Sequence, residues 1–403
     1  MAATGRSRTR RRERDVNRFP AWVEINLDAA RRNIERVRAM VPPGVAILFV
    51  VKADAYGHGA VRISRLAEEC GVAMLGVATL DEGRELRRAG IGLPVLVLSP
   101  VLPQEIDRAL ENDLAVTASS LEFAEAAGEA ARSRGGTCTL HIEIDTGMGR
   151  AGVPCDEAVD TIVRMSAVPG VRLEGVYTHF PVSDSDSSFT RDQIDSFTAI
   201  VDRLAAAGVA FRYVHSANSA AIMNFPSSHF NLVRPGLFVY GHAPSTALHD
   251  RIDVEPVMSF KARLVLVRDM PAGASVSYGR TYVAQQPIRM GVVPVGYGHG
   301  LSHRLSNNGH FLYRGNRVPI VGRVTMDMTM IDLSAFPDAR VGEEIVIFGR
   351  QGAGEITADD VARWDETLSY EVLCRISKRV ARIYLRSGRI ESMKTLLGVR
   401  HAP

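Results

Sequence analysis

Between Asp28 and about Gly236 the chain alternates short apolar runs with stretches that have a helical pattern. The intervening stretches are amphipathic, and two of them, which begin at Leu80 and Thr198, end on glycine, a usual helix stop. This alternation is typical of repeated strand–helix units that build a parallel sheet. The apolar runs span residues 47–52, 74–79, 94–99, 114–118, 139–145, 172–179, 211–216 and 230–235.

Eight such units over roughly 210 residues predict an N-terminal (β/α)8 TIM-like barrel. A doubly wound open sheet is the alternative, but no G-x-G-x-x-G turn follows the first strand. After about Glu255 the helical periods give way to short alternating strands punctuated by Gly and Pro, which indicate a C-terminal β-strand domain. The expected fold class is therefore α/β plus all-β. We assign residues 19–255 to the barrel, 256–390 to the β domain and 391–403 to a tail.

The distribution of charge and cysteine argues against several classes of function. The first 18 residues hold seven arginines against two acidic residues, whereas the rest of the chain has 41 basic and 43 acidic residues. A folded body that is not basic gives no support to nucleic-acid binding, and we expect residues 1–18 to be a disordered Arg-rich tail. No apolar run approaches the ~20 residues of a membrane span. The four cysteines have no metal-like spacing, so we expect no metal site, and reduced thiols in a cytoplasmic protein.

The first apolar run leads directly into Lys52, and a polar turn with Tyr56 and two glycines follows. A lysine at the exit of a strand buried on both faces loses hydration, which lowers the pKa of its ammonium from ~10.4 toward the neutral amine. A neutral amine in a pocket is the group that Schiff-base chemistry needs. The alternative is a lysine that simply reaches solvent at a strand end, and the other strand ends help to decide between the two.

Candidate site residues, most of them polar, follow five of the eight predicted strands, at the ends where barrels carry their chemistry. They are Lys52 and Tyr56 after the first strand, Arg150 after the fifth, His179 after the sixth, His215, Asn218 and Ser219 after the seventh, and Arg234, Gly236 and Leu237 after the eighth. Loops after strands seven and eight commonly hold phosphate, and Ser219 begins a short helix there. A lysine amine, two arginines, a histidine ring and a phosphate cup together describe a site for covalently held pyridoxal 5'-phosphate.

Nine short motifs carry a resemblance to a known family. They are V-V-K-A-D-A-Y-G-H-G, D-T-G-M-G-R-A-G, Y-T-H-F, H-S-A-N-S-A-A, R-P-G, V-S-Y-G, V-G-Y, G-R-V-T-M-D and S-Y-E-V. From about Trp22 to Tyr384, their order and spacing resemble those of the alanine racemases, which use pyridoxal phosphate. The resemblance implies two-base interconversion of L- and D-alanine by a homodimer with shared active sites, which supplies D-alanine for peptidoglycan.

The resemblance also implies roles for individual residues. Lys52 would hold the cofactor as a Schiff base and serve D-alanine as a proton base, whereas Tyr278, contributed by the second subunit, would serve L-alanine. Arg150 and the backbone of Met326 would bind the substrate carboxylate. The cofactor-binding residues would be Lys52, Tyr56, His179, Ser219, Arg234, Gly236, Leu237 and Tyr370, and the supporting residues Glu143, Asp327, Asn218 and His215.

Arg234 and Tyr278 constrain this chemistry further. Arginine is not deprotonated in proteins, so Arg234 would donate to the ring nitrogen and leave the ring neutral. A neutral ring is a weaker electron sink than a protonated one, which disfavours side reactions such as transamination. A tyrosine with pKa ~10 is a poor base unless cations favour its phenolate, and Arg150 and His179 are the first candidates for that role.

The chain departs from the family pattern at several positions. Glu143 stands where the family often has a carbamylated lysine, so an anion is present without modification and we expect activity independent of bicarbonate. An unrelated inward-facing carboxylate is the alternative reading of Glu143. His299 replaces an acid, and Thr325 stands where cysteine is common. These changes surround the substrate entrance, so a broader racemase that accepts serine or other small amino acids is an alternative function.

Three rival functions remain. An amino-acid decarboxylase would share the cofactor, but it needs no pair of opposed bases, so the tyrosine of V-S-Y-G argues against it. A non-catalytic pyridoxal phosphate carrier would, by resemblance, be a lone barrel without a β domain. A structural barrel would bind no cofactor at all.

Overall fold

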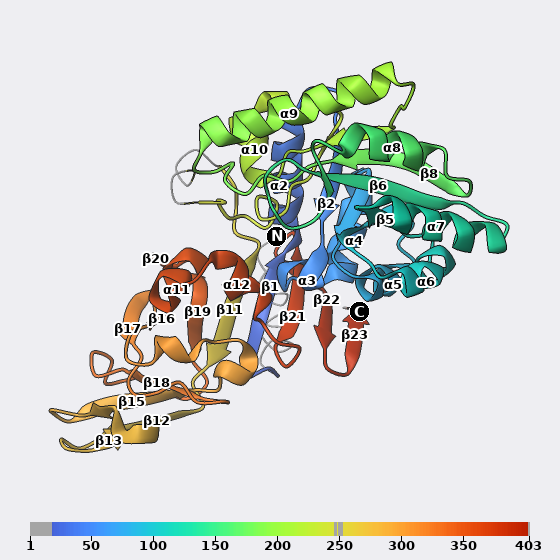
Figure 1. Cartoon of the computed structure of the whole chain (residues 1–403). Helices are drawn as coiled ribbons and strands as arrows, with labels where there is room; N and C mark the ends of the chain where they lie inside the picture. The colour runs from blue at the N-terminus through green and yellow to red at the C-terminus, as the bar shows by residue number, and fades with distance from the viewer. Residues whose placement is uncertain (1–17, 246–247, 249–252, 402–403) are drawn as a thin grey trace, which may run out of the picture. The chain divides into compact units, whose positions relative to one another are not determined.

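The computed structural model describes residues 18–245, 248 and 253–401 (Figure 1). The chain divides into two compact units, one made of residues 30–56 and 60–255, and a second that combines the N-terminal part up to residue 29 with residues 57–59 and 256 onward. The prediction of a disordered tail at residues 1–18 lies outside the described residues, apart from Arg18. Among the described residues, no helix is both long and apolar enough to span a bilayer.

The first unit is a nearly closed barrel of eight parallel strands, and each predicted apolar run forms one of them. The strands are β2 (Ala46–Val50), β3 (Met74–Val77), β4 (Val95–Pro100), β5 (Ala115–Ala118), β6 (Cys138–Asp145), β8 (Val171–Tyr177), β9 (Tyr213–His215) and β10 (Leu232–Val233). Their order is β10-β2-β3-β4-β5-β6-β8-β9, and every neighbouring pair is parallel. Between β9 and β10 the backbone of Arg234 donates to Ala217 O at 2.8 Å. The predicted barrel is therefore confirmed.

Helices precede or follow the strands and lie on the outside of the barrel (Figure 1). They are α2 (Leu27–Met40), α4 (Ala60–Glu69), α5 (Leu80–Arg88), α6 (Ile106–Glu111), α7 (Leu121–Ser133), α8 (Ala158–Ser166), α9 (Ser187–Ala206) and α10 (Ser219–Asn224). Side-chain caps begin several of them, because the first N–H groups of a helix have no partner within it. Asp186 caps α9 and Asn218 caps α10.

The interior of the barrel carries polar groups. On β6 the alternation of side chains places His141 and Glu143 on the same face, and both are buried. The phenol of Tyr177 lies 3.0 Å from the hydroxyl of Thr117, which itself donates to Val97 O. Buried polar groups are stable only when they are hydrogen-bonded, so this interior is organised by hydrogen bonds as well as by apolar packing.

The second unit contains the β-rich part of the chain. Its main sheet has the order β17-β16-β19-β11-β1-β21-β22-β23. These strands are β1 (Ala21–Asn26), β11 (Met258–Arg263), β16 (His310–Tyr313), β17 (Asn316–Pro319), β19 (Glu344–Gln351), β21 (Ala381–Arg386), β22 (Arg389–Thr395) and β23 (Gly398–His401). A smaller sheet joins β12 (Leu266–Met270), β15 (Ile288–Val293) and β18 (Thr329–Asp332), and β13 (Ser275–Val276) pairs with β14 (Tyr282–Val283).

Two parts of the chain differ from their assignment by sequence. β1 lies in the range assigned to the barrel, but it pairs antiparallel with β11 and parallel with β21 in the second unit. The alternation of side chains in a strand indicates which residues are extended, but it does not indicate which strand lies beside them. The pairing of β1 with β11 and β21 was therefore not visible in the sequence. Residues 391–403 were assigned to a tail, but β22 and β23 form antiparallel pairs there. Their alternation was obscured because most of their side chains are polar and either partly or fully exposed.

Candidate active site

Lys52 begins a turn with an unusual backbone. The next four residues, 53–56, all have φ between 52° and 54°, the left-handed region that costs a non-glycine residue ~1–2 kcal/mol. Four such residues in succession are rare, and strain of this kind is found where a functional group must be presented in one direction. The turn is held by hydrogen bonds from Ala55 N to Val51 O at 2.9 Å and from Ala60 N to the carboxylate of Asp54 at 2.8 Å.

Glu82 also holds this turn, and the sequence analysis missed it. Its Oε1 accepts from Ala53 N at 2.7 Å, and its Oε2 accepts from Ala78 N at 2.7 Å. The same carboxylate forms a capping box with Thr79 at the start of α5. The sequence signal, T-L-D-E after an apolar run, indicates a helix cap and gives no hint of a second contact with the lysine turn.

A cup of backbone donors lies where the sequence predicted a phosphate site. The backbone N–H groups of Ser219, Ala220 and Leu237 make no hydrogen bond to the described residues, although all three residues are buried. The hydroxyl of Ser219 accepts from Gly236 N at 3.0 Å, which brings the two segments together. A Cβ at Gly236 would lie 2.9 Å from the phenol oxygen of Tyr56, so a side chain there would collide with Tyr56. Buried N–H groups are almost always paired, so this cup fits an anionic group such as a phosphate.

Arg234 is anchored deep in the barrel by carbonyl oxygens. Its Nη1 donates to His215 O at 3.0 Å, and its Nη2 donates to Thr178 O at 2.8 Å and to Ser216 O at 3.0 Å. Burial lowers the pKa of Arg234 to about 10, so it remains a cation at neutral pH. Its Nε–H makes no hydrogen bond to the described residues and is free to donate to a ligand.

His179 accepts a hydrogen bond at Nδ1 from Arg234 Nη2 at 3.3 Å, because a guanidinium can only donate. Burial, and the nearby positive charges of Arg234, Arg150 and Lys52, lower the pKa of His179 to about 3. The ring is therefore neutral and presents a flat apolar face with one N–H. That three cations act on one ring shows that the structure brings these predicted site residues together.

Glu143 faces Arg150 across the end of β6. Its side chain is 3% exposed, and its Oε1 lies 3.8 Å from Arg150 Nη2. Burial raises the pKa of Glu143, which Arg150 and Arg234 partly oppose. The loop that carries Arg150 is held by Asp145, whose carboxylate accepts from Gly147 N and Gly149 N. The side chain of Arg150 is half exposed, so the N–H groups of its guanidinium are available to bind a carboxylate.

Tyr278 lies in the second unit, on the short helix η4 (Tyr278–Arg280), and its side chain is 73% exposed. The preceding residue, Ser277, has φ 67° and ψ −177°, a region that is essentially restricted to glycine. Its hydroxyl donates to Arg323 O at 2.6 Å. The two motifs V-S-Y-G and G-R-V-T-M-D therefore adjoin, and a strained backbone presents Tyr278 outward.

Met326 lies in the same unit with its side chain 53% exposed. Its carbonyl accepts from Gly298 N at 2.9 Å, whereas its own N–H makes no hydrogen bond to the described residues. The Thr325 hydroxyl accepts from Met328 N at 3.1 Å and donates to Met328 O at 2.8 Å, which fixes the turn. Asp327 pairs with Arg379 at 2.7 Å. An unpaired N–H on an exposed residue fits the predicted role of Met326.

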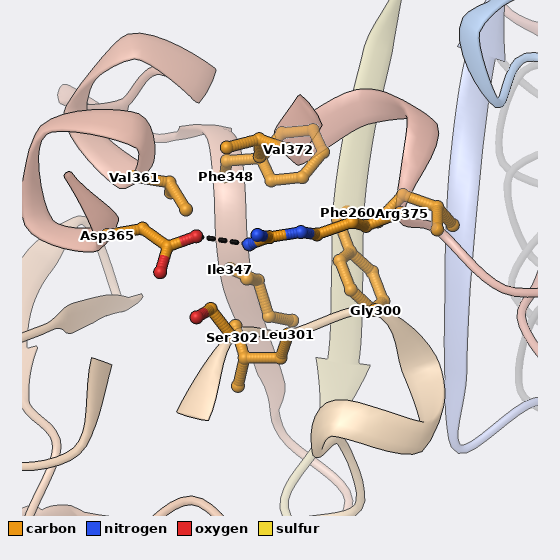
Figure 2. Close-up of a pocket in the computed structure, with 11 residues that line it drawn as sticks. Phe260, Gly300, Leu301, Ser302, Ile347, Phe348, Val361, Asp365, Val372 and Arg375 are labelled. Carbon is orange, nitrogen blue, oxygen red and sulfur yellow. Dashed lines mark hydrogen bonds and ion pairs between the residues drawn. The ribbon is translucent and has the colours of Figure 1, made fainter. Parts of the chain in front are cut away.

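Tyr370 is carried by α12 (Ser369–Cys374), which follows α11 (Ala358–Asp365). Figure 2 shows a pocket beside these helices in which Asp365 and Arg375 form an ion pair among apolar side chains. Arg375 also pairs with Glu371 on α12. The pocket is lined by none of the predicted site residues, so we assign its ion pairs to the orientation of α12 and hence of Tyr370.

The residues after the strands of the barrel are thus gathered in one unit, and Tyr278, Met326, Asp327 and Tyr370 lie in the other. Comparison with known proteins identifies the family to which these two units belong. The alanine racemase N-terminal domain family matches residues 25–244, and the alanine racemase C-terminal domain family matches residues 257–384. The chain belongs to the alanine racemase family. Members of this family are isomerases whose cofactor is pyridoxal 5'-phosphate, the group that the cup, the lysine and the arginine fit.

Individual members of the alanine racemase family resemble the chain over nearly its whole length. "Alanine racemase 2" of Caldanaerobacter subterraneus is 41% identical over 94% of this chain and 98% of its own length. The alanine racemase of Desulforamulus reducens is 41% identical over 91% of this chain and 99% of its own length. Among solved structures, the alanine racemase of Clostridium difficile has a TM-score of 0.91 and 36% identity, with 94% of this chain and 99% of that chain covered. The Bacillus anthracis alanine racemase with bound L-Ala-P has a TM-score of 0.89 and 37% identity, with 94% and 98% covered.

Proposed function

We propose that the protein racemises alanine with pyridoxal 5'-phosphate, by two bases on opposite faces of the substrate, and so supplies D-alanine for peptidoglycan in the cytoplasm. The observation that carries the proposal is the barrel site, where three orphaned N–H groups, a buried arginine with one free donor and a strand-end lysine occur together. The proposed holder of the phosphate is the cup at Ser219, Gly236 and Leu237, with Tyr56 and Tyr370.

The bound cofactor supplies an electron sink for the bond between the substrate Cα and its hydrogen. The chain supplies the rest. Lys52 Nζ would remove or return the proton on the face that serves D-alanine, and Tyr278 Oη would do so on the face that serves L-alanine. A positioned base contributes typically 10²–10⁴-fold, so both bases are needed for turnover in either direction.

Other residues would orient the reacting groups. Arg234 Nε–H would donate to the ring nitrogen, and it cannot protonate that nitrogen because its guanidinium is held as a cation by its pKa of about 10. Arg150 and the backbone N–H of Met326 would bind the substrate carboxylate. Glu143 would hold Arg150, a role that its 3.8 Å contact supports.

The exposure of Tyr278 and Met326 supports a homodimer with shared active sites. A catalytic phenol in open solvent would gain no help from a low dielectric, and water would compete for its hydrogen bonds. Burial of this surface against a second copy of the chain would remove both problems.

Absorbance and optical rotation together test the proposal. The purified protein should show a visible band that is lost on borohydride reduction, since reduction fixes the lysine–cofactor bond, and it should then racemise no L-alanine. Before reduction, optical rotation of L-alanine should fall to zero. Parallel assays with serine and lysine separate an alanine enzyme from the broader racemase, and release of carbon dioxide would reveal a decarboxylase. A colourless, inactive protein would overturn the proposal.

A further inference from the structure

A line of buried polar side chains runs from Arg234 through the interior of the barrel. Arg234 Nη1 lies 2.9 Å from Nδ1 of His215 on β9, and Nε2 of His215 lies 2.9 Å from Nδ1 of His141 on β6. His141 Nε2 in turn lies 3.7 Å from Oε2 of Glu174 on β8, which is within ion-pair range but longer than a hydrogen bond. Both histidines are completely buried. None of the roles described above uses His141 or Glu174.

The contacts determine where each proton must lie. A guanidinium has no acceptor, so Arg234 donates and His215 Nδ1 carries no proton. The proton of a neutral His215 is therefore on Nε2, where it points at His141 Nδ1 and makes that nitrogen the acceptor. His141 then carries its own proton on Nε2, which faces Glu174. A second proton on either ring would bring two N–H groups face to face.

The surroundings favour this one arrangement. Burial and the charge of Arg234 lower the pKa of His215, and burial lowers the pKa of His141 against the opposing influence of Glu174, so both rings are neutral. The contact with His141 lowers the pKa of Glu174, with the positive charges of Arg172 and Arg212 adding to it. The carboxylate thus ends the line as an anion, and its partners on the solvent side are two exposed arginines at 3.9 Å and 3.5 Å.

The barrel also leaves room for the rings and fixes their planes. The ring of Tyr177 is stacked on His215 with 4.9 Å between centroids, and Tyr213 is stacked on His141 at 6.1 Å. A Cβ at Gly175 would lie 2.3 Å from His141 Nδ1, so only glycine at this position admits the ring. Tyr177 and Tyr213 are themselves titratable, and Glu143, which faces Tyr177, is a further titratable group close to the line.

We propose that His215, His141 and Glu174 form a positioning relay, fixed by the Arg234 guanidinium at one end and by the Glu174 carboxylate at the other, in which each imidazole presents a ring lone pair toward Arg234. The relay keeps Arg234 fixed, with its Nε–H directed away from the relay. The catalytic consequence rests on the proposed function, in which this Nε–H faces the cofactor ring, whereas the proton positions within the relay do not.

The proton positions can be measured directly by nitrogen NMR of the holoenzyme with 15N-labelled histidine, with signals assigned from His141→Gln and His215→Gln. We expect both rings to be neutral and protonated on Nε2, without titration from about pH 6 to about pH 9. In Glu174→Leu the anionic end is lost and His141 Nε2–H has no acceptor, so His141 should become a mixture of the two tautomers. His215 still faces the Arg234 donor and should stay protonated on Nε2. Glu174→Gln keeps an acceptor oxygen and should retain most of the original tautomer. Gly175→Ala should displace His141 without removing any relay group.

The same variants give a functional readout. Glu174→Leu should lower kcat for alanine about tenfold in both directions with KM changed less than about twofold, and shift the visible band of the cofactor. Glu157→Gln, which removes an exposed carboxylate at the start of α8 with no capping bond, is the matched control and should change neither. An unchanged His141 tautomer in Glu174→Leu, a doubly protonated ring in the wild type, or a loss of stability alone with kcat and spectrum intact would each overturn the relay.

The proposed function and the proposed relay can be tested independently of each other. If the protein bound no cofactor, the tautomer measurement on the protein as purified would still support or overturn the relay. If Glu174→Leu did not fold, Gly175→Ala and Glu174→Gln would still distinguish the outcomes, because a relay requires the first to disturb the tautomers more than the second.

Discussion

In the barrel unit Arg234 is 4% exposed and donates to three carbonyl oxygens, whereas in the second unit Tyr278 is 73% exposed and stands on a strained turn. The barrel residues are thus organised by contacts within their own unit. The residues of the second unit are oriented by their backbone, and their side chains remain available to another surface. The comparison teaches that folding of the barrel orders one half of the proposed site, whereas the other half remains exposed and, in the proposed function, meets a second copy of the chain.

The largest expected effect is on the rate of racemisation, and it tests the exposed residue of the second unit. Tyr278→Phe should lower racemisation by about 10²–10⁴-fold, because it removes one of the two proposed bases. Exchange of the α-hydrogen of D-alanine with solvent deuterium should persist through Lys52, whereas that of L-alanine should be lost. Proton NMR of both enantiomers in heavy water measures this asymmetry.

The control for Tyr278→Phe is Tyr282→Phe, which removes a phenol four residues along the chain on β14 and should leave both exchange rates unchanged. Equal exchange of L-alanine by Tyr278→Phe and the wild type would contradict the assignment of the second base.

The next largest effect is on the free energy of unfolding, which should fall when a buried residue of the barrel is changed but not when an exposed residue of the second unit is changed. Arg234→Lys keeps the charge but cannot supply the fork that satisfies three buried carbonyls, so the free energy of unfolding should fall by about 2–4 kcal/mol. Met326→Ala, at an exposed position of the second unit, should change it by less than about 0.5 kcal/mol. Urea denaturation followed by circular dichroism measures both. Equal losses in the two variants would remove the distinction between the halves.

The smallest effect concerns Glu143, and its sign follows from the raised pKa of this carboxyl. The folded protein favours the protonated form more than the unfolded chain does, so ionisation costs stability as pH rises through the glutamate range and above. Glu143→Gln removes this cost, and the variant should be more stable than the wild type at about pH 8 but not at about pH 3.

The same substitution should raise KM for alanine about threefold to tenfold, because Arg150 loses its charged partner. Wild-type activity should not depend on added bicarbonate. Thermal denaturation across pH and initial-rate kinetics test the two statements, and an unchanged KM would assign Glu143 to the core alone.

Much of the site could be read from the sequence, because barrel strands end at one face. Eight apolar runs predicted the strands, and the residues directly after them, such as Lys52, His179 and Arg234, were found together in the structure. Glu82 and His141 were missed for a physical reason. In the sequence pattern Glu82 is an ordinary helix-capping residue and His141 is an ordinary strand residue, so neither position indicates a functional role.

The sequence by itself determined the periodic order of strands and helices, the lysine at the end of the first strand and the motifs of the family, since these depend on local spacing. Only the tertiary structure decided which strands are neighbours, and hence that β1 joins β11 and β21, that Glu82 reaches the lysine turn and that His141 lies between His215 and Glu174. These are contacts between residues far apart in the chain. They follow from the closure of the barrel and the pairing of strands, which place side chains together without leaving a local pattern.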